Sequence, residues 1–148
     1  MKSSKTAFIT DFAAIQELFQ SGQQRSLRAV HAAMLETYLE IGAILSRKIR
    51  EEGWGDQEIH KLSEWLIHNT GSGHTFAASN LEYMLHFHEA WSGQEEWLPL
   101  LPELTWSSHQ VLLNECKSDE QRRHYLAAAV NGRWTRQELE ERIRGGRS

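Results

Sequence analysis

The chain of 148 residues contains only two prolines, Pro99 and Pro102, and they stand close together. Because proline is the strongest breaker of helices, the long stretches on either side can form helices without interruption. From Gln23 to Glu52 apolar side chains recur in steps of three and four residues, which is the spacing of one helix face. We therefore expect one long helix here, about 40 Å in length. Its apolar stripe consists of Leu27, Val30, Met34, Tyr38, Ile41 and Leu45.

The same spacing predicts helices along the rest of the chain. A first helix begins at Asp11, and Ser21-Gly22 interrupts or bends it before the long helix. The apolar residues on one side of this first helix are Phe12, Ile15, Leu18 and Phe19. After the long helix we expect helices over residues 56–69, 77–91, 107–116, 118–130 and 135–144, with residues 92–105 as a loop. No segment shows the alternation of a strand. The sequence therefore predicts a single all-α domain of about six to seven helices over residues 1–144, followed by a flexible tail, 145–148.

Four of the predicted helix starts share one local pattern. An aromatic residue is followed by a capping position, then two residues, an acid or amide, and an aliphatic residue. The acid or amide can bond back to the amide of the cap, while the aromatic packs on the aliphatic side chain. Ser107 and Thr135 are expected to give full capping boxes, Gly55 a weaker cap and Ala77 none from its side chain. The pattern is a fold feature, and it accounts for three of the six tryptophans, Trp54, Trp106 and Trp134.

The composition of the chain indicates the cellular compartment in which the protein is expected. The chain has one cysteine, Cys116, so it forms no disulfide within itself, as expected in a reducing compartment. The first ten residues lack the apolar run of a signal peptide, and no apolar run approaches the roughly 18 residues that span a bilayer. We expect a cytoplasmic protein with no membrane partner.

The charge is unevenly distributed along the chain. The net charge is −4, yet residues 53–116 contain only one Lys or Arg, Lys61, against nine Asp and Glu residues. Any basic surface must therefore come from the two ends of the chain.

Five stretches carry a resemblance to a known family. They are SLRAVHAAMLETYLEIGAIL (26–45), EEGWGDQEIHKLSEWL (51–66), FAASNLEYMLHFHEAW (76–91), LTWSSHQVLL (104–113) and EQRRHYLAAAVNGRWTRQELEERI (120–143). In this order they resemble the N-terminal domain of YhcG-like proteins, a family of unknown function in which a PD-(D/E)xK nuclease domain usually follows. The resemblance implies an all-helical fold with a helix-turn-helix-like middle, and a link to DNA processing or defence.

Two departures from the family limit what can be carried over. The chain contains no Asp…Glu-x-Lys strand pattern, so nuclease activity is not transferred; the chain is either a natural short form or a fragment of a longer nuclease. The family usually has basic residues on the helix after Phe76, whereas residues 77–91 contain no Lys or Arg, and Ala78 and His86 stand at the corresponding positions.

We therefore expect a non-catalytic targeting or assembly module of a nuclease-linked system, acting through protein contacts and needing no cofactor. Its partner would be a second copy of the chain or a nuclease subunit. The long stripe from Leu27 to Leu45 is the candidate self-association surface, unless it simply forms the domain's own core. The alternative is a direct DNA-binding helix-turn-helix-like domain, because affinity for duplex DNA comes mostly from Lys and Arg at phosphates. Candidate nucleic-acid contacts are Arg25, Arg28, Arg47, Lys48, Arg122, Arg123 and Arg136.

Two catalytic alternatives are weaker. His60, Glu64 and His68 share a helix face, but i to i+8 spans about 12 Å, so one compact metal site would also need another histidine. The other histidines considered are His74, His86 and His88. A nucleophilic Cys116 has only His109 nearby in sequence, two helical turns away, and a lone cysteine on a helix face is usually a small core residue.

Overall fold

The computed structural model describes the backbone of residues 2–146 and the side chains of residues 11–146. That part of the chain contains six α-helices and one 3₁₀-helix, and no strand. The elements are α1 (Lys2–Glu52), α2 (Asp56–Thr70), α3 (Ala78–Trp91), η1 (Glu95–Glu103), α4 (Trp106–Glu115), α5 (Asp119–Gly132) and α6 (Arg136–Gly145). The prediction of a single all-α domain is confirmed. The helix-turn-helix expected from the resemblance corresponds to α2 and α3, which residues 71–77 connect.

Helix α1 is unbroken over 51 residues, and a helix of that length extends for about 75 Å. The predicted break or bend at Ser21-Gly22 is therefore wrong. One glycine costs a helix only about 1 kcal/mol, and the glutamine and arginine residues that follow it are good helix formers. The helix ends where the sequence predicts. Gly53 adopts a φ of 68°, and its amide donates to the Ile49 carbonyl at 3.1 Å, which is the bond of an αL C-cap.

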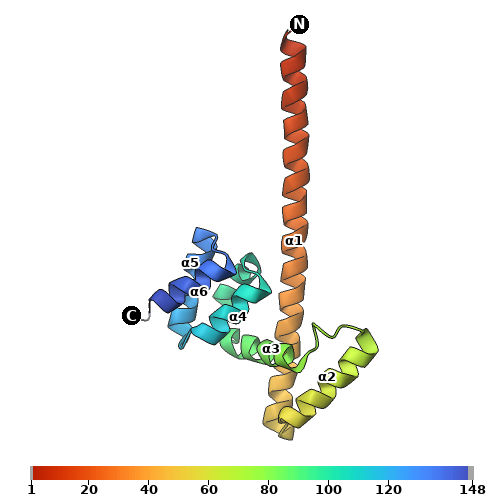
Figure 1. The fold of residues 1–148 in the computed structure, drawn as a ribbon, viewed down its shortest axis with the longest axis vertical. Helices are drawn as coiled ribbons and strands as arrows, with labels where there is room; N and C mark the ends of the chain where they lie inside the picture. The colour runs from red at the N-terminus through yellow and green to blue at the C-terminus, as the bar shows by residue number, and fades with distance from the viewer. Residues whose placement is uncertain (1, 147–148) are drawn as a thin grey trace.

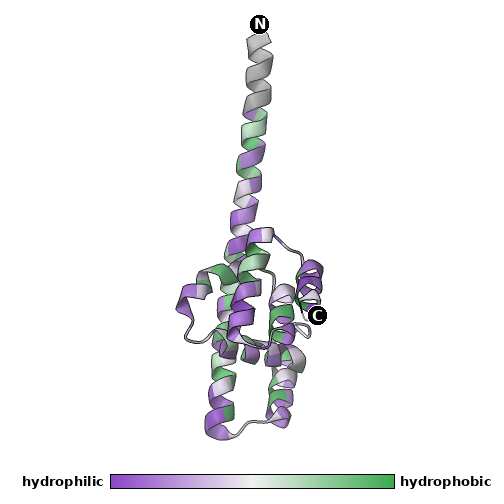
Figure 2. Ribbon diagram, turned by 90° about the vertical axis from the view of Figure 1, so that its left-hand side faces the viewer, coloured by the Kyte–Doolittle hydropathy of each residue, from purple (hydrophilic) through white to green (hydrophobic). Residues whose placement is uncertain are grey.

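The other elements gather around the C-terminal part of α1, and we call α2 to α6, η1 and this part of α1 the body. Figure 1 shows α4, α5 and α6 on one side of this rod and α2 on the other, with α3 crossing it. Towards the N-terminus α1 continues well beyond this body. We call residues 11–30 the projecting segment. Figure 2 shows it from a second side, with hydrophobic and hydrophilic residues interleaved along its length.

The core lies where α1 crosses α3. A Cβ atom on Gly42 would lie only 2.1 Å from the Met84 carbonyl oxygen, so the two helix backbones approach as closely as glycine allows. Around this crossing, large side chains from α1, α3, η1, α4, α5 and α6 are fully buried. They are Leu45, Leu81, Met84, Phe87, Trp91, Leu101, Leu112, Leu126, Leu139 and Ile143.

Two boundaries differ from the prediction. Residues 92–105 were expected to form a loop, but most of them form η1. A short 3₁₀-helix suits this segment because Pro99 and Pro102 have no amide hydrogen to donate to the carbonyl four residues earlier, as an α-helix requires. Leu101, between the two prolines, is buried in the core. Gly145, which was predicted to begin the tail, is instead the last residue of α6, and the Gly146 amide donates to the Arg142 carbonyl at 3.1 Å. Arg147 and Ser148 lie outside the described residues.

Three of the four predicted helix starts are confirmed. At α2, the Glu58 carboxylate accepts from the Gly55 amide at 2.9 Å. At α6, the Thr135 hydroxyl accepts from the Glu138 amide at 3.1 Å. Ala77 begins α3 without a side-chain cap, as expected.

The start of α4 is the exception. Its cap is Thr105, whose hydroxyl accepts from the Ser108 amide at 3.2 Å, so the predicted cap Ser107 is already inside the helix. Trp106 is consequently the first helical residue. Its ring packs 4.8 Å from Tyr38 and 5.1 Å from Phe87, and its indole N–H donates to Asn80 at 2.8 Å.

Candidate functional site

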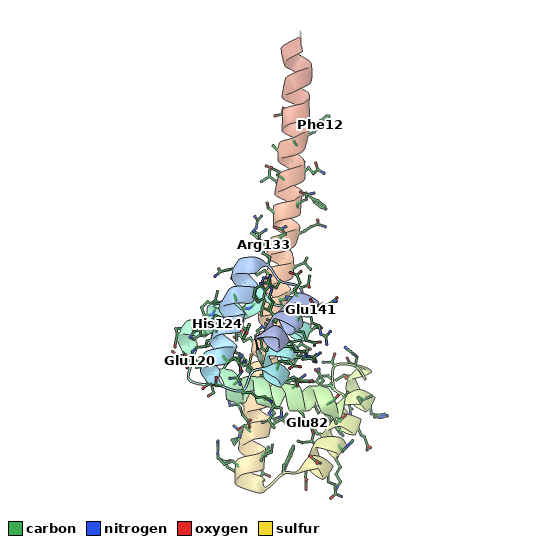
Figure 3. All side chains as sticks on the ribbon, turned by 60° about the vertical axis from the view of Figure 1, so that its left-hand side comes forward. Phe12, Glu82, Glu120, His124, Arg133 and Glu141 are labelled. Carbon is green, nitrogen blue, oxygen red and sulfur yellow. The ribbon has the colours of Figure 1, made fainter. Side chains whose placement is uncertain are left out.

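The projecting segment exposes most of the large apolar side chains that the body leaves uncovered. Six of them are each between 63% and 69% exposed: Phe12, Ile15, Leu18, Phe19, Leu27 and Val30. Figure 3 shows Phe12 on the part of α1 that stands clear of the other helices. Soluble proteins rarely expose contiguous apolar surface of this kind except where another molecule binds. The projecting segment is therefore the candidate interaction surface.

The stripe predicted for self-association divides in the structure. Tyr38 and Leu45 are buried in the core, and Met34 and Ile41 are half-buried against it. Only Leu27 and Val30 remain exposed. The domain itself therefore uses four of the six positions, and the exposed surface lies further towards the N-terminus. The helical spacing placed Phe12, Ile15, Leu18 and Phe19 on one helix face, but the predicted break or bend at Ser21-Gly22 separated that face from the stripe proposed for self-association.

A shallow groove lies where the projecting segment leaves the body. It has a volume of about 510 Å³ and lies between Leu27 and His31 of α1 and Pro102 of η1. The Arg28 Nε atom donates to the Glu103 carboxylate at 2.6 Å across this junction. Both side chains are solvent-exposed, so this pair orients α1 on η1 more than it stabilises the fold.

The seven candidate nucleic-acid contacts are spread over three helices, α1, α5 and α6. Four of them already pair with carboxylates: Arg28 with Glu103, Lys48 with Glu52, Arg122 with Asp119 at 2.6 Å, and Arg136 with Glu140 at 3.8 Å. A fifth, Arg123, donates to the Gln94 side chain at 2.7 Å. Arg25 and Arg47 are exposed at distant places on α1. The structure thus distributes these cations instead of collecting them on one face.

Helix α3, the counterpart of a recognition helix, lies at the centre of the body. Its apolar side has Leu81, Met84 and Phe87 fully buried. Its exposed residues are Ser79, Glu82, His86 and Glu89, and the His86 ring lies 3.7 Å from the Glu89 carboxylate. An acidic exposed face is poorly suited to the phosphates of a DNA groove.

The candidate metal ligands do not form a cluster in the structure. Among the described residues, no three His, Cys, Asp or Glu side chains gather closely enough to hold a metal ion. His60, Glu64 and His68 are all exposed on α2. Cys116 is buried at the end of α4, as predicted for a small core residue.

His109 is the one fully buried titratable side chain among the described residues with a large shift in its pKa. Its Nε2 atom lies 2.7 Å from the Leu101 carbonyl, so this nitrogen carries the proton and donates. Its Nδ1 atom is buried without a hydrogen-bond partner, and the ring packs 5.0 Å from Phe87. Burial lowers the pKa of His109 from 6.5 to about 4, which keeps the ring neutral. The hydrogen bond from His109 to Leu101 joins α4 to η1, and the fully buried ring is not accessible to a substrate.

Comparisons with known proteins give one match. A family model described as the DUF1016 N-terminal domain matches residues 14–146, which is nearly the whole chain. Searches of curated proteins and of solved structures return no match. The matched region includes all five stretches that carried the resemblance and extends through the projecting segment from residue 14. In the part of the chain that the structure describes, no helix is long and apolar enough to cross a membrane.

Proposed function

Because the chain belongs to the DUF1016 N-terminal domain family, we propose that it is a non-catalytic targeting or assembly module of a nuclease-linked system, acting through protein contacts in the cytoplasm. The observation that carries this proposal is the projecting segment, whose large apolar side chains are more than three-fifths exposed. In proteins most of the stability of a helix comes from the packing of its apolar face, and the apolar side chains of the projecting segment are exposed. A partner that covers its apolar side would both stabilise the helix and bury those side chains.

The arrangement of the body supports a scaffold more than a reaction site. Its buried polar side chains, Ser63, Ser108 and His109, form bonds within the fold: Ser63 to the Phe76 carbonyl, Ser108 to Thr105 and His109 to the Leu101 carbonyl. These bonds hold helices and their connections together. The body would therefore present α1 at a fixed angle to a partner.

Light scattering and affinity capture test this proposal. The full chain is measured alone and mixed with a PD-(D/E)xK nuclease domain of the kind that usually follows this domain in the family. We expect association in at least one of the two samples, and a Phe12→Ser/Phe19→Ser variant should lose it. The matched control is Trp65→Ser on α2, which removes an aromatic side chain that is equally exposed at 62%. A chain that remains a monomer and does not retain the nuclease would overturn the proposal.

Direct DNA binding is the alternative function, and the structure gives it less support because most of the candidate cations already have carboxylate partners. We expect the full chain to shift no duplex DNA in a gel at low salt, where phosphate contacts are strongest. Tight binding that weakens steeply with added salt, and that Arg25→Ala/Arg47→Ala reduces, would favour the alternative over the assembly module.

A further inference from the structure

The projecting segment carries a second periodic pattern, distinct from the stripe that enters the core. Starting at Phe12, steps of three and four residues lead through Ile15, Phe19, Gly22, Ser26 and Ala29 to Ala33. This is an unbroken series of a and d positions of a heptad repeat. We call these seven residues the α1 seam.

The α1 seam faces away from the body. Ala29 and Ala33 are exposed. Their neighbours on the other side of the helix are covered: Ala32 is half-buried and Leu35 is buried. At about 100° per residue, the seam lies roughly opposite the side of α1 that carries Leu35 and Tyr38. A second helix could therefore lie along the seam without meeting η1 or α3 of the same chain.

Side-chain size changes abruptly along the α1 seam. Its N-terminal positions, Phe12, Ile15 and Phe19, are large, whereas the positions from Gly22 onward are glycine, serine and alanine. Two parallel copies would place phenylalanine against phenylalanine at one end and leave a gap between small residues at the other. Two antiparallel copies would instead place every large residue opposite a small one.

The register of that antiparallel pair follows from the spacing. With a two-fold axis between Gln20 and Ser21, Phe12 faces Ala29 of the second copy, Ile15 faces Ser26, and Phe19 faces Gly22. Each layer then joins one large and one small side chain, which is how knobs fill holes between closely packed helices. The interface is isologous, so one seam supplies both halves.

Charge points to the same orientation. Asp11 precedes Phe12, and Arg25 precedes Ser26, so both flank the same edge of the α1 seam. In an antiparallel pair this edge faces the same edge of the second copy, so Asp11 of one copy and Arg25 of the other lie on one side, about 7.5 Å apart along the axis. In a parallel pair the edge would instead face the opposite edge of the partner, which carries the uncharged Gln16 and Gln23.

We infer that the partner of the projecting segment is a second copy of this chain, bound antiparallel along the α1 seam. This inference rests on the proposed assembly function and names the partner of the same surface. The resulting dimer holds its two bodies at opposite ends of the paired helices, facing away from the two-fold axis.

Gly22 provides the sharpest test because the monomer leaves space at that position. A Cβ atom there would meet nothing closer than an Arg25 side-chain nitrogen at 3.8 Å, so a larger residue leaves the fold intact. In the dimer the same residue would collide with Phe19 of the second copy.

We expect Gly22→Phe and Phe19→Ala each to raise the dimer dissociation constant by about tenfold or more, measured by sedimentation. The double variant Phe19→Ala/Gly22→Phe exchanges large for small in the same layer and should restore dimerisation. Trp65→Ala on α2, which removes a similarly exposed side chain outside the projecting segment, should leave it unchanged.

Orientation is measured by electron spin resonance with one spin label on each chain, at position 14 or at position 20. In the antiparallel dimer, labels at position 14 are displaced by about 20 Å along the helix axis, whereas labels at position 20 are almost level. A parallel dimer would give similar distances at both positions and would overturn the inference while leaving the assembly function intact.

The remaining outcomes separate the two proposals. A strict monomer that captures the nuclease through the projecting segment would overturn the inference alone. A strict monomer that captures nothing would overturn both. A dimer that Gly22→Phe does not weaken, or that the double variant fails to restore, would place the contact elsewhere than the α1 seam.

Discussion

Thr105 and Ser107 show how a single hydroxyl decides where a helix begins. The sequence pattern favoured Ser107, because it stands between Trp106 and Gln110 as Thr135 stands between Trp134 and Glu138. The structure instead has Thr105 accepting from the Ser108 amide. The sequence alone could not separate the two hydroxyls, since both precede the helix by a plausible distance. The choice follows from the packing of Trp106 between Tyr38 and Phe87, which are distant in sequence.

A matched pair of substitutions tests this assignment. We expect Thr105→Ala to lower the free energy of unfolding by about 1 kcal/mol, because the Ser108 amide loses its acceptor. Ser107→Ala should change it by less than about 0.5 kcal/mol, because Ser107 is an exposed residue inside the helix. Urea unfolding followed by circular dichroism measures both, and the reverse order of effects would restore Ser107 as the cap.

His109 makes stability depend on pH. Its pKa is depressed to about 4 in the folded protein, below the ordinary 6.5 that it regains on unfolding. Between these two values the unfolded chain binds a proton that the folded protein excludes, so stability falls as the pH decreases. Integration gives a loss of about 2 kcal/mol between pH 7.5 and pH 5. In urea unfolding at several pH values, His109→Gln should lose this part of the pH dependence while keeping a donor for the Leu101 carbonyl. An unchanged slope would contradict the neutral buried ring.

At the scale of elements, the helical period predicted most of the fold because the helices have apolar residues at helical spacing, and α4, α5 and α6 also have side-chain caps. The errors arise where long-range packing decides. Residues 92–105 contain two prolines and suggested a loop, but the burial of Leu101 holds them as η1. The break expected at Gly22 does not occur, because a glycine inside a helix is tolerated when nothing else ends it.

Two glycines of α1 have opposite roles, which gives a test within one helix. Gly42→Ala would force a methyl group to 2.1 Å from the Met84 carbonyl, so α1 and α3 must separate. We expect a loss of about 3 kcal/mol or more despite the better helix propensity of alanine. Gly22→Ala, measured in dilute monomeric protein, should instead be neutral or stabilising by up to about 1 kcal/mol. Thermal unfolding compares the two; equal effects would mean that the α1–α3 contact is looser than the structure has it.

At the scale of the whole molecule, the sequence predicted a long helix whose apolar stripe either binds a second copy or forms the domain's own core. It could not predict which part of α1 remains exposed. The stripe from Leu27 to Leu45 and the α1 seam have the same steps of three and four residues, and only the position of α3 shows which of them the body covers. The distribution of ion pairs likewise depends on tertiary contacts such as Arg28 with Glu103, so the candidate DNA contacts could be named from the sequence but not grouped.

The central claim is that the projecting segment is an association surface, and hydrogen exchange measures this most directly. In the monomer, residues 11–30 have few packing contacts to protect their amides, so most of them should exchange rapidly while α3 exchanges slowly. The full chain is examined over a range of concentrations. We predict that protection of residues 11–30 appears as concentration rises, and that Gly22→Phe abolishes it without changing protection in α3. Rapid exchange of residues 11–30 at every concentration, and also with the nuclease present, would contradict the account.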